Sequence, residues 1–140
     1  MGASKASARW EGGLKDGKGT MKPGHGAEGP FSFGTRFAGE SGSNPEELIG
    51  AALSGCYSMA LTAAIEKAGH QPKSVRTEAE VHLEKQASGF AITNIALKTN
   101  VMAPGLSQAQ LEDLAEETRK GCPVAKALAG AEITVDANLA

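Results

Sequence analysis

Aromatic side chains are scarce in this chain of 140 residues, which has one Trp, one Tyr and four Phe. A core built mainly from small and short aliphatic side chains must bring its helices close together to pack well. The length fits a single domain over residues 1–140 with one sizeable core. We also expect a second copy of the chain to cover part of the apolar surface.

The chain also lacks a large excess of charge of either sign, since its net charge is -2 and no basic run is present. This balance gives no sign of a nucleic acid or an anionic membrane as partner. The first residues, "MGASKASARWEGG", have no apolar stretch behind their charges, so no secretory signal is visible. We therefore expect a cytoplasmic protein.

One apolar run does stand out, because residues 48–65 carry no charge. Eighteen such residues reach the length at which a membrane span becomes a candidate. However, the run is rich in Ala, Gly and Ser, and neither Lys nor Arg flanks its start. We interpret it as a helix buried within protein.

The turn residues and the apolar periodicity predict an α+β fold, with antiparallel β-sheets around a long central helix. Asn44 is a suitable N-cap for that helix, with Pro45 at its first position and Gly69 as its stop. Strands are expected at 7–12, 31–37, 74–85, 90–102 and 132–139, a tight hairpin turn at 16–19, and helices at 45–68, from 107 to about 120, and from 123.

Cysteine is nearly absent, and the two present are Cys56 and Cys122. Cys56 lies within the apolar run, where a free cysteine often serves as a small packing residue. Cys122 precedes Pro123 at the start of a helix, where backbone N–H groups stabilise a thiolate, although a plain cap residue is the alternative. In a reducing compartment two cysteines are expected to be free, metal-bound or catalytic.

Metal binding is disfavoured because the two cysteines are 66 residues apart, with no CxxC and no nearby His pair. The three histidines, His25, His70 and His82, are scattered and are expected to be solvated. Cysteine chemistry remains, and a buried thiolate needs a fixed positive charge. Arg36 is the candidate cation and Glu46 its candidate anchor, although an exposed strand arginine and a helix-start glutamate are simpler explanations of each alone.

With these residues, the sequence resembles a known family, the osmotically inducible protein C type of the OsmC/Ohr superfamily of organic hydroperoxide reductases. The resemblance covers essentially the whole chain, through "WEGGLKDGKGT", "FSFGTRFAGESGSNPEELIGAALSGCYSMAL", "SGFAITNIALKT" and "KGCPVAKAL". An arginine twenty residues before the first cysteine, a glutamate ten before it and a later "GCPV" make up its specific pattern.

The resemblance implies a role for each of these four residues. Cys56 would be the peroxidatic cysteine and Cys122 the resolving one, while Arg36 would activate the thiolate and Glu46 would orient Arg36. It further implies an intertwined homodimer, a preference for organic (alkyl or lipid) hydroperoxides, and a role in oxidative or osmotic stress defence. Neither metal, haem nor flavin is implied; an external thiol or dithiol would supply the electrons.

Combined with the chemistry of the residues, this gives a mechanism in which Cys56 forms a sulfenic acid and then a disulfide with Cys122. We expect an ionised Cys122 with a low pKa, and apolar contacts to the substrate from Leu53, Tyr57, Met59 and the Phe residues of 31–37. Ten helical residues, about 15 Å, separate Glu46 from Cys56, so either Arg36 bridges much of this gap or Arg36 and Glu46 serve the cysteine of a partner subunit. We favour a site formed between two chains.

Two other functions compete with this reading. A non-catalytic protein that binds a hydrophobic small molecule would not need paired thiols. A thiol–disulfide oxidoreductase acting on proteins fits the wide cysteine spacing and the apolar surroundings poorly.

Overall fold

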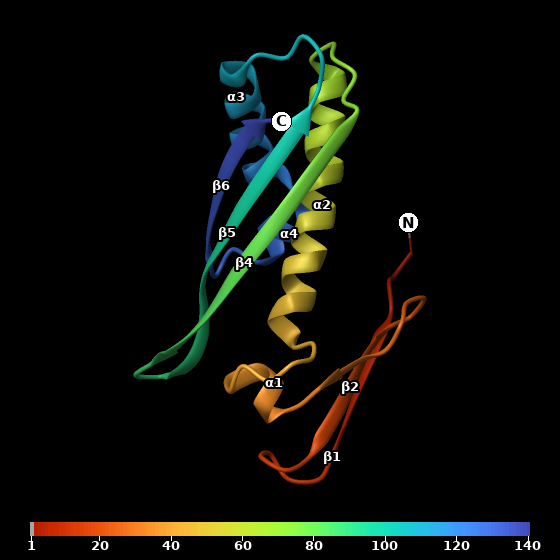
Figure 1. The fold of residues 1–140 in the computed structure, drawn as a ribbon, viewed down its shortest axis with the longest axis vertical. Coiled ribbons are helices and arrows are strands. Elements are labelled where there is room, and N and C mark those ends of the chain that lie inside the picture. Colours follow the sequence, from red (N-terminus) through yellow and green to blue (C-terminus); the bar gives the residue numbers. More distant parts are fainter. Residues whose placement is uncertain (1) are drawn as a thin grey trace. The chain divides into compact units, whose positions relative to one another are not determined.

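The computed structural model describes residues 2–140, which form both strands and helices (Figure 1). In chain order the elements are β1 (Ala6–Glu11), β2 (Lys18–Pro23), β3 (Gly29–Phe31), α1 (Phe33–Phe37), α2 (Pro45–Lys67), β4 (Ser74–Gln86), β5 (Gly89–Met102), α3 (Gln108–Gly121), α4 (Pro123–Ala127) and β6 (Glu132–Leu139). The predicted α+β class is confirmed. The chain forms two compact units, one ending at Leu48 and one beginning at Ile49. A single domain over residues 1–140 stays a prediction.

The first unit contains a three-stranded antiparallel sheet in the order β1-β2-β3. Gly19 of β2 pairs with Trp10 on one side and Phe31 on the other, and these two rings lie 5.3 Å apart between centroids. A Cβ on Gly19 would lie 2.5 Å from the Phe31 ring and 2.6 Å from the Trp10 ring. Glycine therefore allows the rings to meet across the middle strand. The β1–β2 loop spans 12–17 and is longer than the tight turn predicted at 16–19, because β2 already begins at Lys18.

The half-buried strand predicted over 31–37 is wrong, because residues 33–37 form the short helix α1. Ser32 Oγ accepts a hydrogen bond from the N–H of Thr35 at 3.2 Å, and Thr35 Oγ1 accepts one from the N–H of Ser32 at 2.9 Å. This reciprocal capping box satisfies two backbone donors at the start of the helix. It outweighs the alternation of Phe side chains that suggested a strand.

The second unit contains a sheet in the order β4-β5-β6. β4 and β5 form the predicted antiparallel pair, with a register shift between His82 and Leu83. β5 and β6 are parallel, which the all-antiparallel expectation did not include. A parallel pair needs a long crossover connection, and α3 and α4 supply it here.

The hydrophobic core of this unit is shared between α2, the sheet, α3 and α4 (Figure 1). From α2 it takes Leu53, Tyr57, Leu61 and Ile65, which repeat every fourth residue and are fully buried. Such spacing places all four side chains along one stripe of a helix. The core thereby fixes which face of α2 points toward the sheet.

Another face of α2 is apolar and exposed. Met59 is 78% exposed, and Ala52, Gly55 and Ala63 are exposed at matching helical spacing. By length and composition alone this helix is apolar enough to cross a membrane, yet only 28% of its apolar window is buried. The prediction of a helix buried within protein therefore holds for one stripe of α2 only.

Candidate active site

The two cysteines meet in the second unit although 66 residues separate them. Cys122 Sγ lies 3.0 Å from Cys56 Sγ and donates a hydrogen bond to it. Both cysteines are free, and a disulfide bond would be only about 2.04 Å long. Cys56 is partly exposed on α2, whereas Cys122 is fully buried. The chain therefore places the sulfur of a partly exposed cysteine directly beside the sulfur of a buried one.

The end of α3 positions Cys122. Its N–H donates to the carbonyl of Thr118, the last such bond of α3, and its backbone then turns to an extended conformation with φ -62° and ψ 123°. Pro123 follows as the first residue of α4, where its fixed φ suits a helix start. Cys122 thus closes one helix and opens the next, which holds its side chain on ordered backbone from both sides.

Protonation of Cys122 differs from the sequence expectation of a low pKa. Burial raises the pKa of the Cys122 thiol, and the adjacent Cys56 raises it further, both as hydrogen-bond acceptor and through its charge. The N–H groups of Ala125 and Val124 at the start of α4 lower the pKa, as the helix-start argument predicted, but do not compensate. The direction of the shift contradicts the expected low pKa of Cys122.

Arg36 and Glu46 form a second pair, in the first unit. Arg36 Nε donates to Glu46 Oε1 at 2.8 Å. Glu46 is only 7% exposed, and its Oε2 has no hydrogen-bond partner within residues 2–140. The Arg36 guanidinium carbon also lies 5.3 Å from the centre of the Phe37 ring, within the range of a cation–π contact. The carboxylate is thus a buried anchor for a half-exposed cation.

Asn44 fixes the segment between these two residues. Its Oδ1 accepts the N–H of Glu47 at 2.9 Å, as expected of an N-cap, and its Nδ2 donates to the carbonyl of Thr35 at 3.2 Å. One side chain therefore starts α2 and ties it to α1, the helix that carries Arg36. The sequence indicated the cap but gave no signal for the second bond.

Tyr57, next to Cys56, is a further residue whose role the sequence did not reveal. Its hydroxyl donates to the carbonyl of Ala115 at 2.9 Å and so links α2 to α3. Burial, together with the nearby carboxylate of Glu116, raises the pKa of Tyr57 well above its usual range. Tyr57 and Leu53 are fully buried in the core, and their role in favouring an apolar substrate stays a prediction. Met59, in contrast, is largely exposed.

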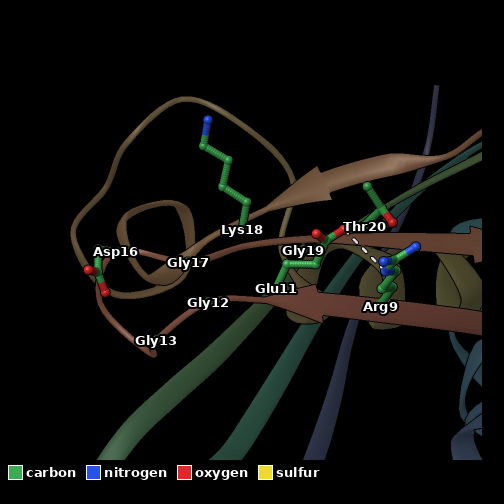
Figure 2. A pocket seen from close by; sticks show the side chains of 9 residues that line it. All are labelled: Arg9, Glu11, Gly12, Gly13, Asp16, Gly17, Lys18, Gly19 and Thr20. Atoms are coloured by element: carbon green, nitrogen blue, oxygen red, sulfur yellow. Dashed lines mark ion pairs between the residues drawn. The ribbon is translucent and has the colours of Figure 1, made fainter.

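Two other kinds of site come into question, a metal centre and a surface pocket. No group of three or more His, Cys, Asp or Glu side chains able to hold a metal ion occurs in residues 2–140. An open hollow of about 450 Å³ lies at the β1–β2 loop. Figure 2 shows the residues that line it, which include glycines and charged side chains of both signs. Arg9 and Glu11 there pair with each other at 3.1 Å and are exposed. None of the four predicted site residues lines this hollow.

Comparisons with known proteins identify the family of this chain. The family model described as OsmC-like protein matches residues 38–138. The chain is 47% identical to the peroxiredoxin OsmC of Escherichia coli strain K12 over 137 residues, which cover 96% of this chain and 95% of that protein. It is 30% identical to the organic hydroperoxide resistance protein of Xanthomonas axonopodis pv. citri over 94 residues, covering 66% of this chain and 64% of that protein.

Solved structures agree in fold. The organic hydroperoxide resistance protein OhrB of Bacillus subtilis superposes with a TM-score of 0.75 at 24% identity, covering 95% of this chain and 97% of that one. An organic hydroperoxide resistance protein from Elizabethkingia anophelis superposes with a TM-score of 0.71 at 26% identity, covering 97% and 95% respectively.

Proposed function

Because the chain belongs to the family of OsmC-like proteins, we propose that it is a thiol-dependent peroxidase that reduces organic hydroperoxides to alcohols. The observation that carries the proposal is the pair of free cysteines whose sulfurs lie 3.0 Å apart, one residue partly exposed and the other buried. Its relatives are named as a peroxiredoxin and as organic hydroperoxide resistance proteins, which supports the choice of oxidant.

In the first step the thiolate of Cys56 attacks the terminal oxygen of the hydroperoxide. A sulfur–oxygen bond forms, the peroxide O–O bond breaks, and the alkoxide leaves and takes up a proton to become the alcohol. Cys56 is then a sulfenic acid, oxidised by two electrons. Its partial exposure supports this assignment, because the substrate must reach the sulfur.

In the second step Cys122 resolves the sulfenic acid. Its sulfur bonds to Cys56 Sγ, and the sulfenic oxygen leaves as water with the proton of the Cys122 thiol. The contact between the two sulfurs means that little chain movement is needed. An external thiol or dithiol then reduces the disulfide by exchange, and we propose that no metal, haem or flavin takes part.

Arg36 is assigned the stabilisation of the Cys56 thiolate and of the developing negative charge on oxygen, with Glu46 as its positioning residue. The buried carboxylate holds the guanidinium through Nε, which leaves the terminal nitrogens for a sulfur or a substrate oxygen. Since about 15 Å of helix separates position 46 from position 56, we propose that Arg36 and Glu46 of one subunit serve the Cys56 of its partner.

A homodimer is the assembly that this proposal requires, and two features support it. In residues 2–48 no apolar side chain is fully buried, so the first unit lacks a core of its own and must pack against another surface to be stable. The exposed apolar stripe of α2, defined by Ala52, Gly55, Met59 and Ala63, is a surface that a second copy would cover.

We propose that the protein works in the cytoplasm as an antioxidant in oxidative or osmotic stress defence. We propose neither a nucleic acid nor a membrane as its partner, since the net charge is -2 and no basic run is present.

Turnover with a small organic hydroperoxide such as cumene hydroperoxide and a dithiol tests the assignment. Cys56→Ser should lose turnover, whereas Cys122→Ser should be oxidised once and then recycle slowly. Equal turnover by the wild type and Cys56→Ser would overturn the function. Binding of the hydroperoxide without any consumption would favour the non-catalytic binding protein instead.

A further inference from the structure

The hydrogen bond between the two cysteines has a direction. Cys122 Sγ lies 3.0 Å from Cys56 Sγ, and we assign the proton between them to Cys122, because Cys122 is fully buried and Cys56 is partly exposed. A thiol is a weak donor toward a neutral acceptor and a better one toward an anion. The contact therefore allows the thiol of Cys122 to solvate a thiolate at Cys56.

Placement of the negative charge follows from burial. Two thiols 3.0 Å apart do not both ionise at moderate pH, because like charges at that distance repel strongly. Cys122 is fully buried and Cys56 is partly exposed, so solvent favours the charge on Cys56. The raised pKa of Cys122 agrees with this distribution.

Neighbouring groups do not reverse this placement of the negative charge on Cys56. The N–H groups of Ala125 and Val124 in α4 favour a charged Cys122 but are outweighed by burial. From α2, Tyr57 is neutral and already donates its hydroxyl proton to Ala115. In α3 the charges of Glu116 and Arg119 act on Tyr57 and pair with each other.

We propose that Cys122 acts before oxidation as well as after it, by donating its S–H to the Cys56 thiolate and so holding the nucleophile in its charged form. This proposal rests on the proposed function and adds to it. The Cys122 proton stabilises the attacking sulfur first, and it later leaves in the water formed with the sulfenic oxygen as the S–S bond closes. Both sulfurs then carry no charge and no further acid is needed.

Titration of single-cysteine variants tests the donor role without any peroxide. Cys122→Ser keeps a hydroxyl donor beside Cys56 and Cys122→Ala removes it, and in both variants Cys56 is the only cysteine left. The ultraviolet absorbance of the thiolate then reports Cys56 alone, since burial moves the ionisation of the single tyrosine, Tyr57, to higher pH. Cys56→Ser supplies the baseline.

We expect half-ionisation of Cys56 about one pH unit higher in Cys122→Ala than in Cys122→Ser, with about tenfold less thiolate below both midpoints. The first oxidation of Cys56, followed in a single turnover, should slow by the same factor. A resolving role alone would impair recycling equally in both variants and leave the midpoints equal, and equal midpoints would overturn the proposal.

The wild-type protein gives an independent check should a variant misfold. One thiolate should appear at the lower pH and the second only at distinctly higher pH, whereas a single step for both would count against the donor role. Separate midpoints without hydroperoxide turnover would refute the proposed function alone. Turnover that depends on Cys56 with coincident midpoints would refute this inference alone.

Discussion

The hydroxyl of Tyr57 offers a sharp test of how the two cysteines are held together. It joins α2, which carries Cys56, to α3, which ends at Cys122, through the bond to the carbonyl of Ala115. Tyr57→Phe removes this bond and keeps the buried ring. We therefore expect lower stability and slower disulfide formation, with the first oxidation of Cys56 nearly unchanged.

The size of the effect follows from the surroundings of the bond. Ala115 lies within α3, so its carbonyl still accepts the helical bond from the N–H four residues later. The variant then loses one hydrogen bond, about 1 kcal/mol, rather than leaving a buried acceptor wholly unpaired. A small void in place of the hydroxyl adds a few tenths of a kcal/mol. The expected total is about 1–1.5 kcal/mol of unfolding free energy.

Denaturant unfolding of the reduced protein measures the stability, and stopped-flow oxidation with one equivalent of hydroperoxide measures disulfide formation. Ser58→Ala is the matched control, since the Ser58 hydroxyl also ties α2 to the unit but bonds Thr77 of β4 at 2.7 Å. It should cost similar stability without slowing disulfide formation. Equal rates of disulfide formation in Tyr57→Phe and wild type would refute the reasoning.

Three more outcomes follow from the site and the assembly. Glu46→Gln should slow oxidation of Cys56 about tenfold, or about 1.4 kcal/mol, because it uncharges the anchor of the arginine, while Glu47→Gln at its exposed neighbour should not; equal rates would contradict the positioning role. Met59→Lys should turn the dimer into monomers in analytical ultracentrifugation because it places a charge in the apolar stripe, whereas Met102→Lys, at an exposed methionine of β5, should not; a monomeric wild type would refute the assembly. Since burial raises the folded-state pKa of Cys122, the unfolded chain loses that proton first, so the unfolding free energy should fall as pH rises above about 9. Urea titrations across that range should show a smaller fall in Cys122→Ser, and an identical fall would contradict the assigned cause.

Features encoded in neighbouring residues were predictable from the sequence. Asn44, Pro45 and Gly69 marked the ends of α2 correctly because a helix end depends on its own few residues. The alternation in 74–85 and 90–102 identified the β4–β5 pair for the same reason. The segment 31–37 misled because its Phe spacing matches a strand, whereas Ser32 and Thr35 form a capping box without the usual Glu or Gln.

Features set by tertiary packing were beyond local patterns. Nothing near Cys56 or Cys122 indicates that their sulfurs meet; the family resemblance alone implied the pairing. The direction of the pKa shift of Cys122 was predicted wrongly because the helix start is visible in the sequence and complete burial is not. Similarly, the second hydrogen bond of Asn44 depends on where α1 ends.

Trp10, whose ring meets Phe31 across Gly19, is an intrinsic fluorescent probe of the first unit. Its only Trp lies in the first unit, at position 10, and its only Tyr lies in the second, at position 57. Trp10 fluorescence therefore reports on the first unit, while Tyr57 reports on the unit that holds the sulfurs. Loss of order in either part can be watched separately in the unmodified protein, without any attached dye.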